Sequence, residues 1–245
     1  MTAAARRFFV EGTQSVGSIV EIAGTDAHRV AHVLRLRRGD RIEVIDSTAT
    51  AFSAAIETTG SVVRASLLCV LGDRATRERL QVQVAQAAPK GTRMDFVVEK
   101  GTELGATAFL PFYCERSVTR SLGEEKLARW RRLARSSAQQ SGRRDVPEIR
   151  APVDFEALLD TFDSYDAVFF AWELAPPHSL GEALARALPR SGRVLVVVGP
   201  EGGFTHAEAD GAARRGATLL SLGSRILRTD TAAVALLAVI GAFTS

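Results

Sequence analysis

A glycine-rich loop is the first segment of this 245-residue chain whose residue types could do chemistry. Residues 199–204 read Gly-Pro-Glu-Gly-Gly-Phe after an apolar run, and glycines let a ligand approach bare backbone amides. The loop has neither the G-x-G-x-x-G spacing of a dinucleotide fingerprint nor the Gly-Lys-Ser/Thr of a P-loop, so both interpretations fail. A tight strand-to-helix turn without a ligand is the alternative. Glu201 weakens it, since a carboxylate there could accept from a ribose hydroxyl or offset a cationic ligand.

A second loop, residues 222–233, carries Arg225 and Arg228 three positions apart. Thr229 or Asp230 is expected to cap the helix that follows, which is rich in alanine and leucine. An arginine just before a helix N-terminus is well placed to meet negative charge that develops on a substrate. The alternative is an ordinary cap that leads into a core helix. A third loop, residues 171–177, also follows an apolar run.

Other kinds of catalytic centre find little support in the sequence. No serine has a plausible histidine and aspartate partner, and His28 and His32 have neither a third ligand nor a catalytic glutamate nearby. Cys69 and Cys114 stand in unrelated contexts, which indicates buried thiols rather than a disulfide or a zinc site. We therefore expect no metal.

Positive charge is concentrated in the middle third of the chain. Residues 76–150 carry 15 basic and 9 acidic side chains, whereas residues 151–245 carry 7 and 11, within a net charge of +3. Of the 31 basic residues 28 are arginine, which favours bidentate contacts with phosphate. The excess indicates either a polyanion-binding surface or a solvated helix face.

The elements that must position these loops fall into two regions with a boundary near residues 72–76. The first region is mostly β and suggests a small barrel or sandwich, whereas the second alternates strands with helices, which is typical of a mostly parallel sheet covered on both faces. In the first region we expect strands over 18–22, 41–46, 50–57 and 62–70 and a helix over 26–34. In the second we expect strands over 80–88, 109–112, 167–172, 193–198 and 218–222, and helices over 92–105, 123–141, 180–188, 206–216 and 230–242.

The composition is 46% hydrophobic and 24% charged, which excludes disordered and fibrous classes. No apolar run approaches the roughly 20 residues of a bilayer helix, and the start of the sequence lacks the apolar core of a signal peptide. We expect a cytoplasmic protein with no membrane partner.

Many segments together form a pattern that no single one carries. They are residues 7–10, 32–35 with 39–40, 90–95, 99–105, 115–117, 140–143 with 146–148, 199–204 and 222–229. In this order they resemble the SPOUT class of RNA methyltransferases, and within it the ribosomal RNA small subunit methyltransferase E family. The resemblance runs nearly from end to end of the chain.

The resemblance implies an α/β fold in two domains. Residues 1–73 would form a small PUA-like β-barrel that helps to hold RNA. Residues 74–245 would form a SPOUT methyltransferase domain with a parallel sheet and a C-terminal deep trefoil knot over about residues 170–245, although knots are rare in proteins. The family acts as a homodimer on 16S ribosomal RNA of the small subunit. It methylates N3 of one uridine, U1498.

The resemblance also assigns residues to the site. The pocket for S-adenosylmethionine would be lined by Trp172, Glu173, Gly199, Pro200, Glu201, Gly202, Leu222, Gly223, Ile226, Leu227 and Arg228. Phosphate contacts with RNA would come from Arg6, Arg7, Arg35, Lys90, Arg93, Arg116, Arg143 and Arg144.

A catalytic role follows for three side chains. Because the N3 proton must leave, negative charge spreads onto the flanking carbonyl oxygens, and Arg228 is our candidate to stabilise it. Asp230 and Glu201 are candidates for the general base, with solvent as the alternative. Two rival functions remain: a SPOUT enzyme that acts on transfer RNA or a ribose 2′-hydroxyl, and an RNA-binding assembly factor without catalysis.

Overall fold

The computed structural model describes residues 6–72, 80–175 and 180–244 of the chain. The chain divides into two compact units. One comprises Met1–Arg77 and Ala138–Asp145, and the other comprises Glu78–Ser137 and Val146–Ser245. A short segment from the middle of the sequence therefore belongs to the N-terminal unit.

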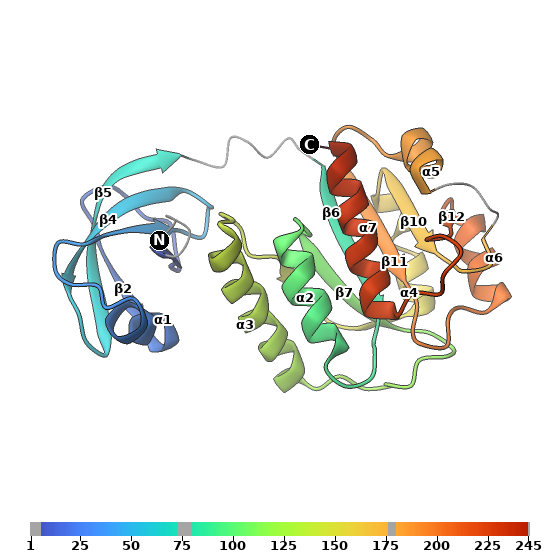
Figure 1. The fold of residues 1–245 in the computed structure, drawn as a ribbon, viewed down its shortest axis with the longest axis horizontal. Helices are drawn as coiled ribbons and strands as arrows, with labels where there is room; N and C mark the ends of the chain where they lie inside the picture. The colour runs from blue at the N-terminus through green and yellow to red at the C-terminus, as the bar shows by residue number, and fades with distance from the viewer. Residues whose placement is uncertain (1–5, 73–79, 176–179, 245) are drawn as a thin grey trace. The chain divides into compact units, whose positions relative to one another are not determined.

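The N-terminal unit is built on a five-stranded sheet of order β1-β3-β4-β5-β2, in which β1 pairs with β3 in parallel and the other pairs are antiparallel. The edge strands of this order are β1 and β2, and Figure 1 shows the sheet curling as part of a barrel. A short helix, α1 (Gly24–His28), continues into a π-helical turn, η2 (Arg29–Val33), and both contribute residues to the core of the unit. The strands are β1 (Arg7–Phe9), β2 (Ile19–Ala23), β3 (Arg41–Ile45), β4 (Ala51–Thr58) and β5 (Val62–Gly72).

The C-terminal unit is built on a parallel sheet of order β12-β10-β11-β6-β7-β8, with β9 also paired to β7. The central strand β11 is buried over almost its whole length, as its unbroken run of valine and leucine predicts. The strands are β6 (Gln81–Ala87), β7 (Ala108–Tyr113), β8 (Glu148–Ile149), β9 (Val153–Asp154), β10 (Ala167–Ala171), β11 (Arg193–Val198) and β12 (Thr218–Leu220).

Helices cover both faces of this sheet, each over its own hydrophobic core (Figure 1). On one face lie α2 (Arg93–Glu103), α3 (Glu124–Ser141), α5 (Leu180–Ala187) and α7 (Thr229–Thr244). On the other face lie α4 (Phe155–Leu159) and α6 (His206–Arg214). No helix within the described ranges is long and apolar enough to span a membrane.

The predicted fold class is confirmed, since a small curled sheet precedes a parallel sheet with helices on both faces. Every predicted strand and helix is present with bounds shifted by a few residues, except that the helix expected over 26–34 is partly π-helical. Four short elements were not predicted: β1, β8, β9 and α4, together with the 3-10 turn η3 (Phe162–Ser164). The knot expected over about residues 170–245 stays a prediction.

Candidate cofactor site

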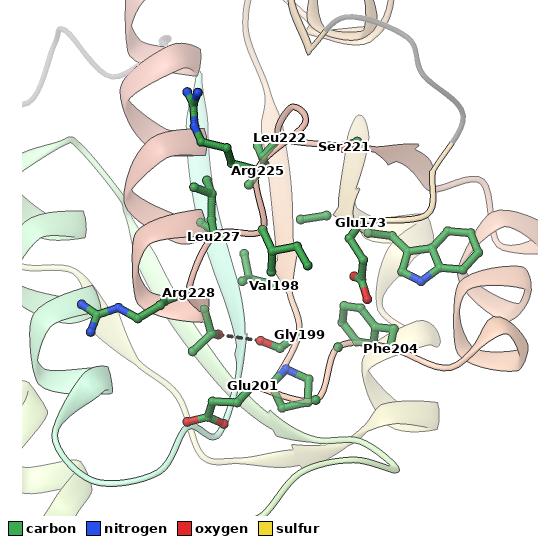
Figure 2. A pocket seen from close by; sticks show the side chains of 18 of the residues that line it. Glu173, Val198, Gly199, Glu201, Phe204, Ser221, Leu222, Arg225, Leu227 and Arg228 are labelled. Carbon is green, nitrogen blue, oxygen red and sulfur yellow. Dashed lines mark hydrogen bonds between the residues drawn. The ribbon is translucent and has the colours of Figure 1, made fainter.

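The three loops identified from the sequence leave β10, β11 and β12, which are neighbours in the parallel sheet. Their carboxyl ends therefore open at one edge, where open α/β sheets bind ligands. A cavity of about 500 Å³ lies there, within the usual size of a small-molecule site. All eleven residues that the resemblance assigned to S-adenosylmethionine line it, and Figure 2 shows these loops around the hollow. Residues 176–177 of the first loop lie outside the described residues.

The loop after β11 needs its glycines for close packing. Gly203 has φ of +65°, and a Cβ there would lie 2.6 Å from the Glu173 carboxylate, which points toward Phe204 in Figure 2. A Cβ on Gly199 would lie 2.9 Å from the Phe204 ring. The loop is a tight turn, closed by a hydrogen bond from the Gly203 amide to the Pro200 carbonyl. Larger residues at either position would push the loop out of place.

Phe204 anchors this loop to the core. Its ring centroid lies 4.1 Å from that of Phe170 and 6.3 Å from that of Phe112, in a cluster that also includes Phe155. The next residue, Thr205, caps α6 in a reciprocal capping box with Glu208. The loop is thus held at its C-terminal end by aromatic packing and by a helix cap.

Glu201 is held in its ionised form. Its carboxylate accepts hydrogen bonds from the Lys90 amide and from the guanidinium of Arg93. Partial burial acts to raise its pKa, but hydrogen bonds from its own amide, from Lys90 and from Arg93 outweigh burial and lower it. A carboxylate with a lowered pKa is a weak proton acceptor near neutral pH. Glu201 is therefore better suited to fixing the loop than to acting as a general base.

Arg228 and Asp230 lie together where α7 begins. The helix starts at Thr229, and the Arg228 carbonyl accepts from the Ala232 amide, so Arg228 occupies the N-cap position. The expectation that Thr229 or Asp230 would be the cap is therefore wrong. Asp230 is buried, and its carboxylate accepts from the Thr231 amide and lies 3.5 Å from the Arg228 guanidinium. The Arg228 side chain is 74% exposed and can reach a substrate.

One of the lining residues, Trp172, has a buried polar atom without a partner among the described residues. The Trp172 indole Nε1 is buried and, among the described residues, has no hydrogen-bond acceptor. Its ring meets that of His206 edge to face at 5.2 Å. The ring belongs to the core cluster that α4 and α6 cover. Apolar side chains of Val198, Leu222 and Leu227 supply a surface for a flat ring.

The seven arginines and one lysine assigned to RNA lie in two groups. Arg93 lines the cavity, Lys90 is exposed beside it, and Arg116 donates to the carbonyl of Gly202. The other five, Arg6, Arg7, Arg35, Arg143 and Arg144, belong to the N-terminal unit. Within this second group Arg35 is exposed, whereas Arg7 is buried, pairs with Glu43 and donates to the Arg143 carbonyl. Arg143 pairs with Asp145, and Arg144 lies 3.9 Å from Glu43.

Several lining residues had no functional assignment from the sequence. Arg225, Phe204 and Thr229 line the cavity, and Arg93 was assigned to RNA alone. The glycine-rich motif could have pointed to Phe204, because an aromatic directly after the glycines can pack beneath them. The expectation of two buried thiols is half wrong, since Cys114 is buried but Cys69 is exposed. Within the described ranges, no group of three or more candidate side chains could hold a metal ion.

Comparisons with known proteins agree with this geometry. A family model for the RNA methyltransferase domain matches residues 76–241. The fold and the site thus define an RNA methyltransferase.

Full-length relatives narrow the class. A ribosomal RNA small subunit methyltransferase E from Bacillus subtilis is 33% identical over 239 residues, which cover 93% of this chain and 92% of the relative. A crystal structure of a ribosomal RNA small subunit methyltransferase E from Neisseria gonorrhoeae bound to S-adenosyl methionine is 31% identical, with a TM-score of 0.84 and 97% of each chain covered. The chain belongs to the ribosomal RNA small subunit methyltransferase E family.

Proposed function

We propose that this protein transfers a methyl group from S-adenosylmethionine to N3 of one uridine in 16S ribosomal RNA. The observation that carries the proposal is the cavity at the ends of β10, β11 and β12, with Arg228 at its rim. Family membership supports the same reaction.

The residues of the cavity fit the cofactor. Backbone groups of the glycine-rich loop and the Glu173 carboxylate offer donors and acceptors beside an apolar surface. When bound, S-adenosylmethionine supplies a methyl group on a sulfonium that is already a good electrophile. The protein then mainly has to align the acceptor nitrogen, which explains why it needs no nucleophilic triad.

Arg228 and Asp230 handle the charge of the acceptor base. When N3 loses its proton, the guanidinium of Arg228 stabilises the negative charge on the adjoining carbonyl oxygens. Asp230 is the better of the two candidate bases, because the Glu201 carboxylate is already bound by Lys90 and Arg93 and has a lowered pKa. Direct proton loss to water is the other route.

The RNA must expose the target base before reaction. N3 lies on the Watson–Crick edge, so the uridine has to be unpaired or flipped out. Arg35 and Lys90 are exposed and suited to phosphate contacts, whereas Arg7, Arg93 and Arg116 also hold protein groups. We further infer from the family resemblance that the enzyme acts in the cytoplasm as a homodimer.

The direct test is to incubate the protein with S-adenosylmethionine and unmodified small ribosomal subunits, digest the RNA and search for 3-methyluridine by mass spectrometry. We expect 3-methyluridine in one equivalent per subunit. A 2′-O-methylated nucleoside, or methylation of transfer RNA only, would replace the proposed target. Cofactor binding measured by calorimetry without any methyl transfer would favour a non-catalytic RNA-binding protein.

A further inference from the structure

One fully buried polar side chain beneath the cavity has no role in the site described so far. Gln86 is 0% exposed and lies near the carboxyl end of β6, at the centre of the parallel sheet. Its amide nitrogen lies 2.7 Å from the Thr229 hydroxyl, 3.3 Å from the Ala87 carbonyl and 3.5 Å from the carbonyls of Val198 and Gly199. Thr229, Val198 and Gly199 line the cavity.

The hydrogen bonds of Gln86 have a fixed direction. The Thr229 hydroxyl lies 2.5 Å from the Gly199 carbonyl, the bond drawn at Gly199 in Figure 2. A carbonyl can only accept, and a hydroxyl has a single hydrogen, so Thr229 donates to Gly199. Thr229 must therefore accept from Gln86, which sets the orientation of the Gln86 amide. A relay of two bonds thus runs from β6 through the start of α7 to the glycine-rich loop.

This orientation leaves the other end of the amide unsatisfied. Gln86 Oε1 is buried and has no hydrogen-bond partner among the described residues. A buried acceptor without a partner destabilises the fold, and an apolar side chain of similar shape would avoid that cost. Packing alone therefore does not account for a glutamine here. The benefit of this residue lies in its N–H donor.

We propose that Gln86 is a positioning residue for methyl transfer. By fixing Thr229 against Gly199, it sets the start of α7 relative to the glycine-rich loop. Arg228 directly precedes Thr229 and Asp230 directly follows it, so both take their places from this bond. Gln86 acts through Thr229 and does not itself touch substrate. The inference rests on the proposed function, because it assigns a role in that reaction.

A matched pair of variants tests the proposal. Gln83 lies on the same strand, is 5% exposed and accepts a hydrogen bond from the Tyr165 hydroxyl, away from the cavity loops. For Gln86→Met we expect the single-turnover rate of methyl transfer to fall by roughly ten- to a hundredfold, because small misplacements are costly, with little change in the dissociation constant for S-adenosylmethionine. For Gln83→Met we expect a near wild-type rate. Equal rates in the two variants would overturn the proposal.

A second variant separates donor geometry from packing. In Gln86→Glu the introduced carboxyl can donate to Thr229 only when protonated, and burial raises its pKa. Its rate relative to wild type should rise as the pH falls, whereas that of Gln86→Met should not change with pH. All rates are taken well below each variant's unfolding temperature. A ratio for Gln86→Glu that does not change with pH would contradict the relay.

A double-mutant cycle completes the test. Thr229→Val removes both bonds of the relay, and Thr229→Ser keeps them. In the double variant, we expect the losses of methyl-transfer rate from Gln86→Met and Thr229→Val not to add, as for residues in one hydrogen-bond network. We expect Thr229→Ser to keep most of the rate that Thr229→Val loses. Additive losses would refute the relay. The absence of 3-methyluridine with the wild-type protein would refute the proposed function itself. That result comes from the wild type alone and is therefore distinct from a failure of the relay, which only the variants can show.

Discussion

At the scale of single residues, some charged side chains of the site bind other groups of the protein, whereas others are exposed and free to contact a substrate. Glu201 of the glycine-rich loop and Arg93 at the start of α2 neutralise each other, and Arg116 is bound to the Gly202 carbonyl. Arg228 is 74% exposed and, among the described residues, pairs with the Asp230 carboxylate at 3.5 Å. We expect its guanidinium to change partners when the base arrives.

The Arg228→Ala variant should lose methyl transfer and keep its fold. Removing one preorganised donor from a developing anion typically costs about 10²-fold or more in rate. Much of the affinity for S-adenosylmethionine should remain, because the other loops of the cavity are intact. Rates on small subunits and calorimetric titration measure the two effects. Arg228→Lys is the control for charge, and unchanged turnover in Arg228→Ala would remove this residue from the mechanism.

The Glu201→Gln variant should lose stability in a pH-dependent way. The folded state lowers the pKa of Glu201 below its ordinary value of 4.5. The ionised carboxylate therefore stabilises the fold above the unfolded pKa, and this contribution disappears as the pH falls through the folded pKa. Wild type should have the higher melting temperature near pH 7, with a difference that shrinks below about pH 4.5. A difference that is constant with pH would show that charge is not the cause.

The residues that line the cavity could be predicted from the sequence, but the partners of its charged and polar side chains could not. The glycines and the arginine loop pointed to the right edge of the sheet because they follow apolar strands. The pairing of Glu201 with Arg93 joins residues more than one hundred positions apart, and no local pattern contains it. The same holds for Gln86 on β6 and Thr229 at the start of α7, which meet because α7 packs against β6 and β11.

At the scale of elements, the glycine-rich loop is shaped by what lies under it. Phe204 fills the space that a side chain on Gly199 would need. The ring also packs on Phe170, so it cannot retreat into the core. The packing of Phe204 therefore fixes the path of the glycine-rich loop between β11 and α6.

The Gly199→Ala variant should disturb the glycine-rich loop. The new Cβ would lie 2.9 Å from the Phe204 ring, so the loop or the ring must shift. Overpacking of this kind typically costs about 1–3 kcal/mol. We expect a lower melting temperature and weaker binding of S-adenosylmethionine, measured by thermal unfolding and calorimetry. Adding Phe204→Leu should recover part of the binding, because the two sites share one contact. The absence of any recovery would argue against this packing account.

Elements with a periodic or continuous apolar pattern could be predicted, and several of the shortest elements could not. The helix over 123–141 has helical periodicity and the strand over 193–198 is an unbroken apolar run, and the structure contains them as α3 and β11. β8 and β9 have two residues each, too few to show alternation. The π-helical turn η2 follows α1 without a break, and nothing in the side-chain pattern separates the two.

At the scale of the whole molecule, the charge distribution favours a polyanionic partner. The basic excess of residues 76–150 lies in the segment that supplies Lys90, Arg93 and Arg116 beside the cavity. The N-terminal unit adds exposed arginine at Arg35. Binding of RNA should therefore weaken steeply as the salt concentration rises.

Two arginines of the N-terminal unit should respond differently to substitution. Arg35→Ala removes an exposed charge and should reduce the slope of log K against log salt by about one for each phosphate that is no longer neutralised. Arg7→Ala breaks a buried pair with Glu43 and should lower the melting temperature, since an unpaired buried charge is costly. Filter binding over a salt series and thermal unfolding measure the two effects. An unchanged salt slope in Arg35→Ala would place the RNA elsewhere.

The return of Ala138–Asp145 to the N-terminal unit limits how the protein can be divided for engineering. Ala138 packs with Phe9, Ile45 and Ala51, and Gln139 exchanges hydrogen bonds with Asp26 and Arg29. A fragment that stops before residue 78 lacks both of these neighbours. The N-terminal unit therefore cannot be removed as one continuous segment of the chain. A chimera that takes this unit from a relative must also take the end of α3 and the turn after it from the same relative.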